Sequence, residues 1–170
     1  EPAVWTERML TALEEGVKGG KWFRLIDKVY AEGNLLAGYG SVAANGGAPG
    51  VDHVTVEAFG NDLEANVRKL SVALHGGTYQ PQAIRRVYIP KLGSNEQRPL
   101  GIPTVRDRVV QAAVRHVVEP IFEKEFAAHS YGFRPGRCCK DALRQVDALL
   151  KEGYVYVVDA DLESYVDTIP

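Results

Sequence analysis

The sequence predicts an α+β fold. Apolar residues recur at helical spacing along most of the chain, Gln82–Ile102 carries β-branched residues on both sides of a turn, and the apolar run Tyr154–Val158 follows near the end. This order of helices, a hairpin, further helices and a last strand is typical of the α+β class. The 170 residues, 45% hydrophobic and 25% charged, suit one compact unit or slightly more.

Three helices are predicted before residue 45. Thr6 can cap the first, which ends at Gly19-Gly20. The second runs from Trp22 to Tyr30 with an aromatic and aliphatic stripe that we expect in the core, and a short third covers Leu35–Ala44.

A loop and a fourth helix follow. Asn45–Asp52 is too rich in Gly and Pro for regular structure, so its backbone can approach another group closely. Asn61 and Glu64 have the spacing of a capping box for a helix over Leu63–Leu74, which Gly76-Gly77 closes.

The hairpin joins Gln82–Pro90 to Arg98–Ile102 through the turn Gly93–Glu96, with Lys91 and Arg98 near its tip. Thr104, followed by Asp107, begins a helix that Pro120 ends, with arginines off its apolar face at Arg106, Arg108 and Arg115.

A further helix, Asp141–Leu150, has a predicted buried stripe made of Leu143, Val146, Leu149 and Leu150. Gly153 then turns the chain into the final strand.

Several classes of protein are not predicted. The chain has no run of about 18 apolar residues and no signal-peptide pattern, so we expect a cytoplasmic protein that does not enter a membrane. Its two cysteines, Cys138 and Cys139, are adjacent, which disfavours a disulfide framework. The four histidines lack the spacing of a zinc site.

Charge is strongly segregated although the formal net charge is only −2. Residues 81–144 hold 12 Lys and Arg against 6 Asp and Glu, a charge of +6, whereas residues 145–170 hold 1 against 6, a charge of −5. A basic surface beside an acidic site suits an enzyme that binds phosphates and uses a metal. The alternative is that the arginines only solvate helix faces.

The acidic end has a specific form. The run Tyr154–Val158 delivers Asp159 and Asp161 at its C-terminal end. A polymerase palm presents oxygen ligands to Mg²⁺ beside a nucleic acid in this way.

Four ordered blocks carry a family resemblance: Arg85–Lys91, Arg98–Gln111, His129–Arg137 and Val158–Asp161. Together they resemble the fingers and the first palm block of reverse transcriptases encoded by bacterial group II introns, and Asn45–Asp52 is similar to the family's extra N-terminal block. The resemblance implies a right-hand polymerase fingers subdomain, made of helices and an antiparallel hairpin, with the first strand of a truncated palm. Its divisions would be an N-terminal helical extension over 1–44, fingers over 45–153 and the start of the palm over 154–170.

The resemblance also implies roles for individual residues. Asp161 matches the aspartate that binds both catalytic Mg²⁺ ions, and the backbone carbonyl of Leu162 would add a ligand to one of them. Lys91 and Arg98 match the residues that grip the triphosphate of the incoming nucleotide, with Arg85 as a third phosphate contact.

Other matched residues would contact nucleic acid. The segment beneath the templating base is Leu100, Gly101 and Ile102, and the template-contacting block contains Arg134 and Pro135. Arg106 and Arg108 are further candidates for nucleic-acid contact. The alternatives are that Arg134 only ties two segments together and that Arg106 and Arg108 are surface charges.

Two positions depart from the family pattern. Val166 stands where a Phe or Tyr normally excludes a ribose 2′ hydroxyl, which predicts weaker discrimination against ribonucleotides. Glu163 stands where Lys is usual.

The implied function is RNA-directed DNA polymerisation by two Mg²⁺ ions, with an RNA template, intron RNA, a DNA primer and dNTPs as partners. No Tyr-x-Asp-Asp sequence occurs before Pro170, so we expect a piece of a longer protein that is inactive in isolation. Alternatives are a non-catalytic RNA-binding module for intron splicing, a retron, diversity-generating or CRISPR-associated reverse transcriptase, and a plain interaction domain. The oligomeric state stays open, a homodimer included.

Overall fold

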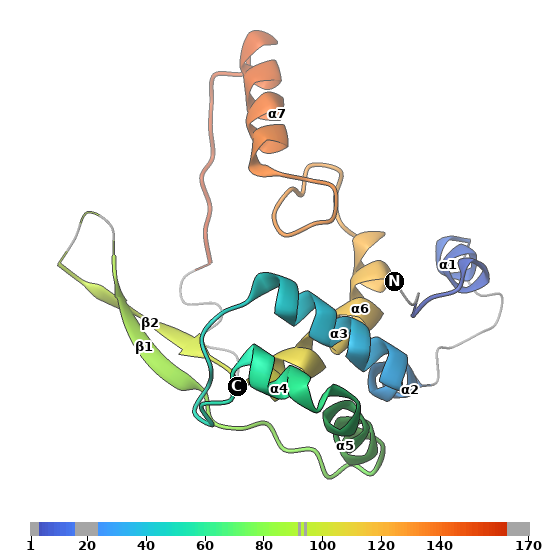
Figure 1. Ribbon diagram of the computed structural model, residues 1–170. Helices are drawn as coiled ribbons and strands as arrows, with labels where there is room; N and C mark the ends of the chain where they lie inside the picture. The colour runs from blue at the N-terminus through green and yellow to red at the C-terminus, as the bar shows by residue number, and fades with distance from the viewer. Residues whose placement is uncertain (1–3, 16–23, 92, 94, 163–170) are drawn as a thin grey trace. The chain divides into compact units, whose positions relative to one another are not determined.

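The protein is described here by a computed structural model over residues 4–15, 24–91, 93 and 95–162 (Figure 1). The chain divides into two compact units, Glu1–Glu125 and Phe126–Pro170. The described residues form helices and a two-stranded antiparallel sheet, so the predicted α+β class is confirmed.

The first helix begins at its predicted cap. In α1 (Glu7–Glu14), the Thr6 hydroxyl accepts a hydrogen bond from the Met9 amide at 3.3 Å, as a helix cap does. Helix α2 (Ile26–Tyr30) is shorter than predicted, and α3 (Glu32–Asn45) is longer. The predicted stop at Gly19-Gly20 and the aromatic residues Trp22 and Phe23 lie outside the described residues.

The predicted capping box at Asn61 is wrong. Asn61 instead ends a helix that the sequence did not indicate, α4 (Val56–Asn61), whose cap is Thr55 accepting from the Ala58 amide at 3.1 Å. Helix α5 (Leu63–His75) begins after Asp62, which makes no side-chain capping bond. A six-residue helix has too few turns for a periodic pattern, which explains why it was missed.

The core of the first unit forms around α3 and α6 (Val105–Glu123), which pack extensively on each other (Figure 1). Leu35 of α3 and Val105, Val109 and Val117 of α6 have no exposed surface. Helices α4 and α5 complete the core with Val56, Phe59, Val67 and Leu70.

Helix α6 runs past Pro120, so the predicted end at this proline is wrong. Proline lacks an amide donor and costs the helix one hydrogen bond there, but the helix reaches Glu123. Trp5, which is buried, donates its indole N–H to the carbonyl of Val117 at 3.2 Å and so ties the N-terminal segment to this helix. None of the described helices, α6 included, has the length and apolar character needed to cross a membrane.

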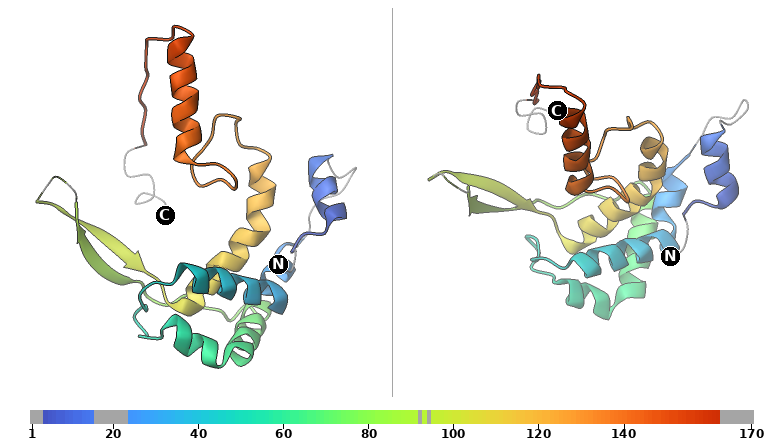
Figure 2. Two further views of the ribbon diagram at one scale, coloured as in Figure 1. Left: turned by 45° about the horizontal axis from the view of Figure 1, so that its top comes forward. Right: turned by 90° about the horizontal axis from the view of Figure 1, so that it is seen from above.

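The predicted hairpin is confirmed. Strand β1 (Arg85–Pro90) pairs antiparallel with β2 (Gln97–Ile102), in a register that sets Arg85 opposite Ile102 and Ile89 opposite Arg98. The two strands project from the helices of the first unit as a ribbon (Figure 2).

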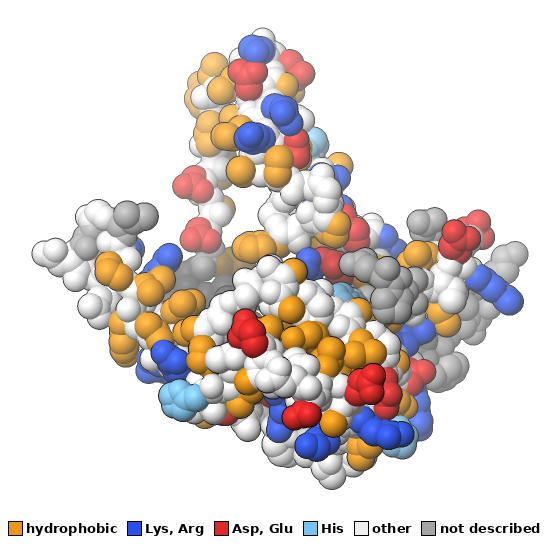
Figure 3. Space-filling view, viewed as in Figure 1, with side chains coloured by type: hydrophobic (Ala, Val, Ile, Leu, Met, Phe, Trp, Pro, Cys, Tyr) orange, Lys and Arg blue, Asp and Glu red, His pale blue; other side chains and the backbone are white. Residues whose placement is uncertain are grey.

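In the second unit the helix is present but its predicted burial is wrong. Helix α7 (Cys139–Lys151) exposes its whole apolar stripe, Leu143, Val146, Leu149 and Leu150. Figure 3 shows hydrophobic side chains in orange on the surface at the top of the view, where α7 lies. The periodic pattern identifies an apolar face, but it does not say which element covers that face.

The predicted final strand is also wrong for the described residues. Tyr154–Leu162 forms no strand, and its side chains are exposed, Tyr156 by 95%. A strand needs a hydrogen-bonded neighbour, and the two described strands pair only with each other.

The contact between α3 and α6 gives a first prediction. A Cβ on Gly38 would lie 2.8 Å from the carbonyl oxygen of Val109, whereas a Cβ on Gly40 of the same helix would meet nothing within 4 Å. We expect Gly38→Ala to lower the free energy of unfolding by about 1–3 kcal/mol through overpacking. Gly40→Ala should raise it by up to about 1 kcal/mol because alanine favours helix.

Urea unfolding followed by tryptophan fluorescence measures both changes, since Trp5 is buried in the core. Equal stabilisation by the two substitutions would contradict the close approach of the helices.

Candidate nucleotide and nucleic-acid site

One face of the hairpin gathers most of the residues that the sequence assigned to the nucleotide. Side chains directly opposite each other in an antiparallel pair point to the same face, and neighbours along a strand alternate. The pairs Arg85–Ile102, Val87–Leu100 and Ile89–Arg98 therefore share one face. Gly101, which pairs with Arg86, belongs to the opposite face.

Lys91 extends this face toward the turn. Its amide donates to the carbonyl of Glu96 at 2.9 Å and so continues the pairing by one residue beyond Pro90. The Lys91 Nζ lies 3.1 Å from Glu96 Oε2, and both side chains are well exposed. Because exposed ion pairs contribute little, between about 0 and 1 kcal/mol, a phosphate can displace Glu96 at small cost.

The face thus has an aliphatic centre between cations. Val87, Ile89 and Ile102 are half-buried and Leu100 is exposed. Arg98 is exposed near the tip, with no acidic partner among the described side chains. Arg85, at the other end, donates from Nη1 to the carbonyl of Pro49 at 3.2 Å.

Pro49 belongs to the Gly-rich loop after α3, so this contact joins the hairpin to that loop. Arg108 of α6 donates to the carbonyls of Gly46 at 3.0 Å and Ala48 at 3.1 Å. The backbone of Gly50 presses on Thr104, where a Cβ would lie 2.7 Å from the Thr104 Cα. The segment after α3 is a loop, as predicted, and its backbone approaches the start of α6 closely.

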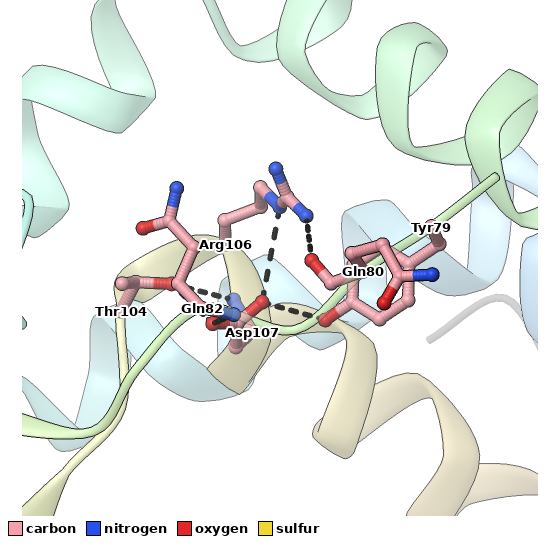
Figure 4. A network of polar contacts seen from close by, with 6 residues as sticks. All are labelled: Tyr79, Gln80, Gln82, Thr104, Arg106 and Asp107. Carbon is pink, nitrogen blue, oxygen red and sulfur yellow. Dashed lines mark hydrogen bonds and ion pairs between the residues drawn. The ribbon is translucent and has the colours of Figure 1, made fainter.

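The start of α6 is fixed by a buried carboxylate (Figure 4). Asp107 accepts hydrogen bonds from the Tyr79 hydroxyl at 2.6 Å, the Thr104 hydroxyl at 2.8 Å and the Gln82 amide at 3.0 Å. Burial, and after it the hydrogen bond to Asp107, raises the pKa of the Tyr79 phenol well above its ordinary value. The hydroxyl therefore stays protonated and remains a donor.

Arg106 also connects the start of α6 to residues 79–82. Its Nη2 donates to the carbonyl of Gln80 at 2.6 Å, its Nε lies 3.8 Å from Asp107 Oδ1, and its guanidinium stacks 5.0 Å from the centre of the Tyr79 ring. The sequence identified Thr104 and Asp107 as a helix start, but it did not indicate that Asp107 also receives groups from residues 79–82.

In the second unit Arg134 has a local partner set. Its Nη1 donates to the carbonyls of Ala127 at 2.9 Å and Ser130 at 3.0 Å, and its guanidinium lies 5.2 Å from the centre of the Phe126 ring. Pro135 beside it is exposed. These contacts agree with the alternative that Arg134 ties segments together, and its contact with a template stays a prediction.

Asp161 is exposed, and one carboxylate oxygen accepts a hydrogen bond from the Leu162 amide at 2.9 Å. An exposed carboxylate next to a backbone carbonyl fits one side of a Mg²⁺ site, since this ion prefers oxygen ligands and keeps several waters. Over the described part of the chain, no three His, Cys, Asp or Glu side chains gather to hold a metal. Glu163 and Val166 lie outside the described residues.

Known proteins share these features of sequence. Residues 89–170 match the family described as reverse transcriptase (RNA-dependent DNA polymerase). The chain is 38% identical over 133 residues to the group II intron-encoded protein LtrA of Lactococcus lactis subsp. cremoris, a match that covers 77% of this chain and 22% of LtrA. The chain is related to the reverse transcriptases of group II introns. The resemblance found in the sequence is thereby confirmed.

Two further proteins are similar to the chain. The protein YkfC of Escherichia coli K12 is 44% identical over 125 residues, covering 71% of this chain and 32% of YkfC. The nuclear intron maturase 2 of Arabidopsis thaliana mitochondria is 37% identical over 62 residues, covering 36% of this chain and 8% of the relative. The chain thus spans about a third or less of these proteins. The names of LtrA and of the intron maturase favour the group II intron assignment over the retron, diversity-generating and CRISPR-associated alternatives.

The joint at Asp107 gives a second prediction. Asp107→Asn keeps the shape of the side chain but replaces one carboxylate oxygen with an NH₂ group. Tyr79, Thr104 and Gln82 donate to the carboxylate oxygens in the native protein, and the donors that face the NH₂ group lose their acceptor. We expect a loss of about 2–3 kcal/mol in the free energy of unfolding, because buried donors lose their acceptor. Asp62→Asn, at an exposed position without a capping bond, is the matched control and should change stability little. Urea unfolding at pH 7 gives both values, and equal effects would rule out a special role for Asp107.

Proposed function

We propose that the chain forms the fingers and the first palm segment of an RNA-directed DNA polymerase encoded by a group II intron. The observation that carries the proposal is the hairpin face on which Arg85, Arg98 and Lys91 surround an aliphatic centre. The proposed divisions are an N-terminal extension over 1–44, fingers over 45–153 and palm from 154.

The hairpin face suits an incoming dNTP. Lys91 offers a compact ammonium and Arg98 a forked guanidinium, which together match the several oxygens of a triphosphate. Arg85 adds a third cation on the same face, although its Nη1 also holds Pro49. The half-buried aliphatic side chains Ile102 and Val87, with Leu100, offer an apolar surface against which a templating base can rest.

The carboxylate of Asp161 and the carbonyl of Leu162 would hold Mg²⁺. When bound, Mg²⁺ supplies charge neutralisation at the α-phosphate and activation of the primer 3′ hydroxyl, and two such ions serve the reaction in polymerases. Asp161 is suited to this role because it is exposed and its only described hydrogen bond comes from its neighbouring amide.

The nucleic-acid partners follow from the same proposal. An RNA template would contact Gly101 and the Arg134–Pro135 block, and a DNA primer would present its 3′ end to Asp161. Arg106 and Arg108, already bonded to carbonyls, would contribute mainly by holding the surface in shape. Intron RNA is a further partner, bound through the basic segment 81–144. At Val166 we propose a wider ribose pocket.

The metal role is tested by Asp161→Ala in the complete protein that carries this sequence. We expect templated primer extension to fall below about a thousandth of the original rate, because a catalytic metal loses its carboxylate, while RNA binding is unchanged. Asp159→Ala, which removes a like charge two residues away, should retain synthesis. Extension that survives Asp161→Ala would refute the assignment, and equal loss of RNA binding would favour a purely RNA-binding module.

The hairpin face is tested by replacing one arginine on each of the two faces of the hairpin. Arg98→Gln should raise the KM for dNTPs about tenfold through the loss of a charge-assisted phosphate contact. Arg86→Gln removes the same charge from the opposite face and should leave KM nearly unchanged. Steady-state incorporation kinetics separate the two, and matching KM values for both variants would argue against the face assignment.

A further inference from the structure

The first unit has a cavity between α3 and α6 that the polymerase proposal does not use. Its volume is about 270 Å³. Its polar lining comes from the end of α3 and from one side of α6, namely Ser41, Asn45, Arg108, Gln111, Arg115 and His116. Each of these side chains has a donor by type, although the Ser41 hydroxyl already donates to the carbonyl of Ala37 at 3.2 Å.

The charged side chains that line this cavity are all basic. Arg108 and Arg115 line it, and no Asp or Glu does. A second cavity of the same unit, of about 550 Å³, shows the contrast, because Glu32 and Glu64 line it together with Arg68. Anions are therefore favoured in the α3–α6 cavity and disfavoured in the other.

Arg108 provides a buried donor without a partner. Its two terminal nitrogens are fixed by the carbonyls of Gly46 and Ala48. Its Nε is buried and makes no hydrogen bond. The guanidinium is thus held in place and adds positive charge to the cavity wall, while its nitrogens are bonded to carbonyls or enclosed.

Arg115 and His116 are held on the same wall. Arg115 uses Nε and Nη2 on one oxygen of Glu119, at 3.1 and 2.7 Å, and Nη1 takes no part in this pair. Asn34 donates to the carbonyls of Lys28 and Ala113, so its oxygen faces His116 Nδ1 at 2.9 Å. Asn34 thereby sets the orientation of the imidazole, whose Nε2 lies 3.5 Å from the Ser41 hydroxyl.

We propose that the α3–α6 cavity binds a phosphate group. A tetrahedral oxyanion can accept hydrogen bonds from several converging donors, and guanidinium groups match its oxygens well. The phosphate can belong to a nucleic-acid backbone or be free in solution, and the chemistry of recognition is the same in both cases. The site is independent of Asp161 and of the hairpin face.

The test measures binding of sulfate, inorganic phosphate and a ten-nucleotide RNA to the 170-residue chain. Amide chemical shifts in NMR spectra give the affinities, with chloride at equal ionic strength as the reference. Gln111→Glu changes the charge of an exposed side chain at constant shape and should weaken binding at least about tenfold. Glu119→Gln releases Arg115 and should strengthen binding.

Arg68→Gln, in the other cavity, is the matched control and should leave the affinities unchanged. Opposite effects of Gln111→Glu and Glu119→Gln cannot both come from a loss of folding. Saturable binding of free phosphate and sulfate would identify a site for a free anion, whereas binding of RNA alone, weakened by Gln111→Glu, would identify a backbone phosphate. Affinities that Gln111→Glu leaves unchanged for all three probes would overturn the proposal.

Discussion

The first unit depends on one buried carboxylate. Asp107 receives donors from Tyr79 and Gln82 of the segment before the hairpin and from Thr104 at the start of α6. A buried charge is costly unless hydrogen bonds surround it, and here both oxygens are occupied. The same residue lies in the helix at the centre of the core, so the hairpin is anchored where packing is tightest.

This anchoring divides the positive charge of the chain into two kinds. Arg106, Arg108 and Arg134 have carbonyl partners and stabilise local backbone. Lys91 and Arg98 are exposed near the hairpin tip, and Glu96, the acidic partner of Lys91 among the described residues, is itself exposed. Residues of the first kind give the surface its shape, and those of the second kind remain available to a ligand.

Local patterns in the sequence were enough to predict the hairpin and the cap at Thr104, because both depend on neighbouring residues. They did not predict that the apolar stripe of α7 is exposed or that residues 154–158 form no strand. Both properties depend on which other elements pack or pair with these segments. For the candidate site, residue types in order predicted the cations of the hairpin. The bonds of Arg85 and Arg108 to the Gly-rich loop join residues 36 and about 60 positions apart, and no short motif encodes them.

The phenol of Tyr79 determines how this anchor responds to alkali. Its folded pKa lies above the value of about 10 that is usual for an unfolded chain. The contribution of the neutral phenol to stability is therefore complete below that value and is lost only as the pH rises through the folded pKa. The Tyr79 hydroxyl thus remains a donor to Asp107 through the neutral range, and this one hydrogen bond is lost only in strongly basic solution.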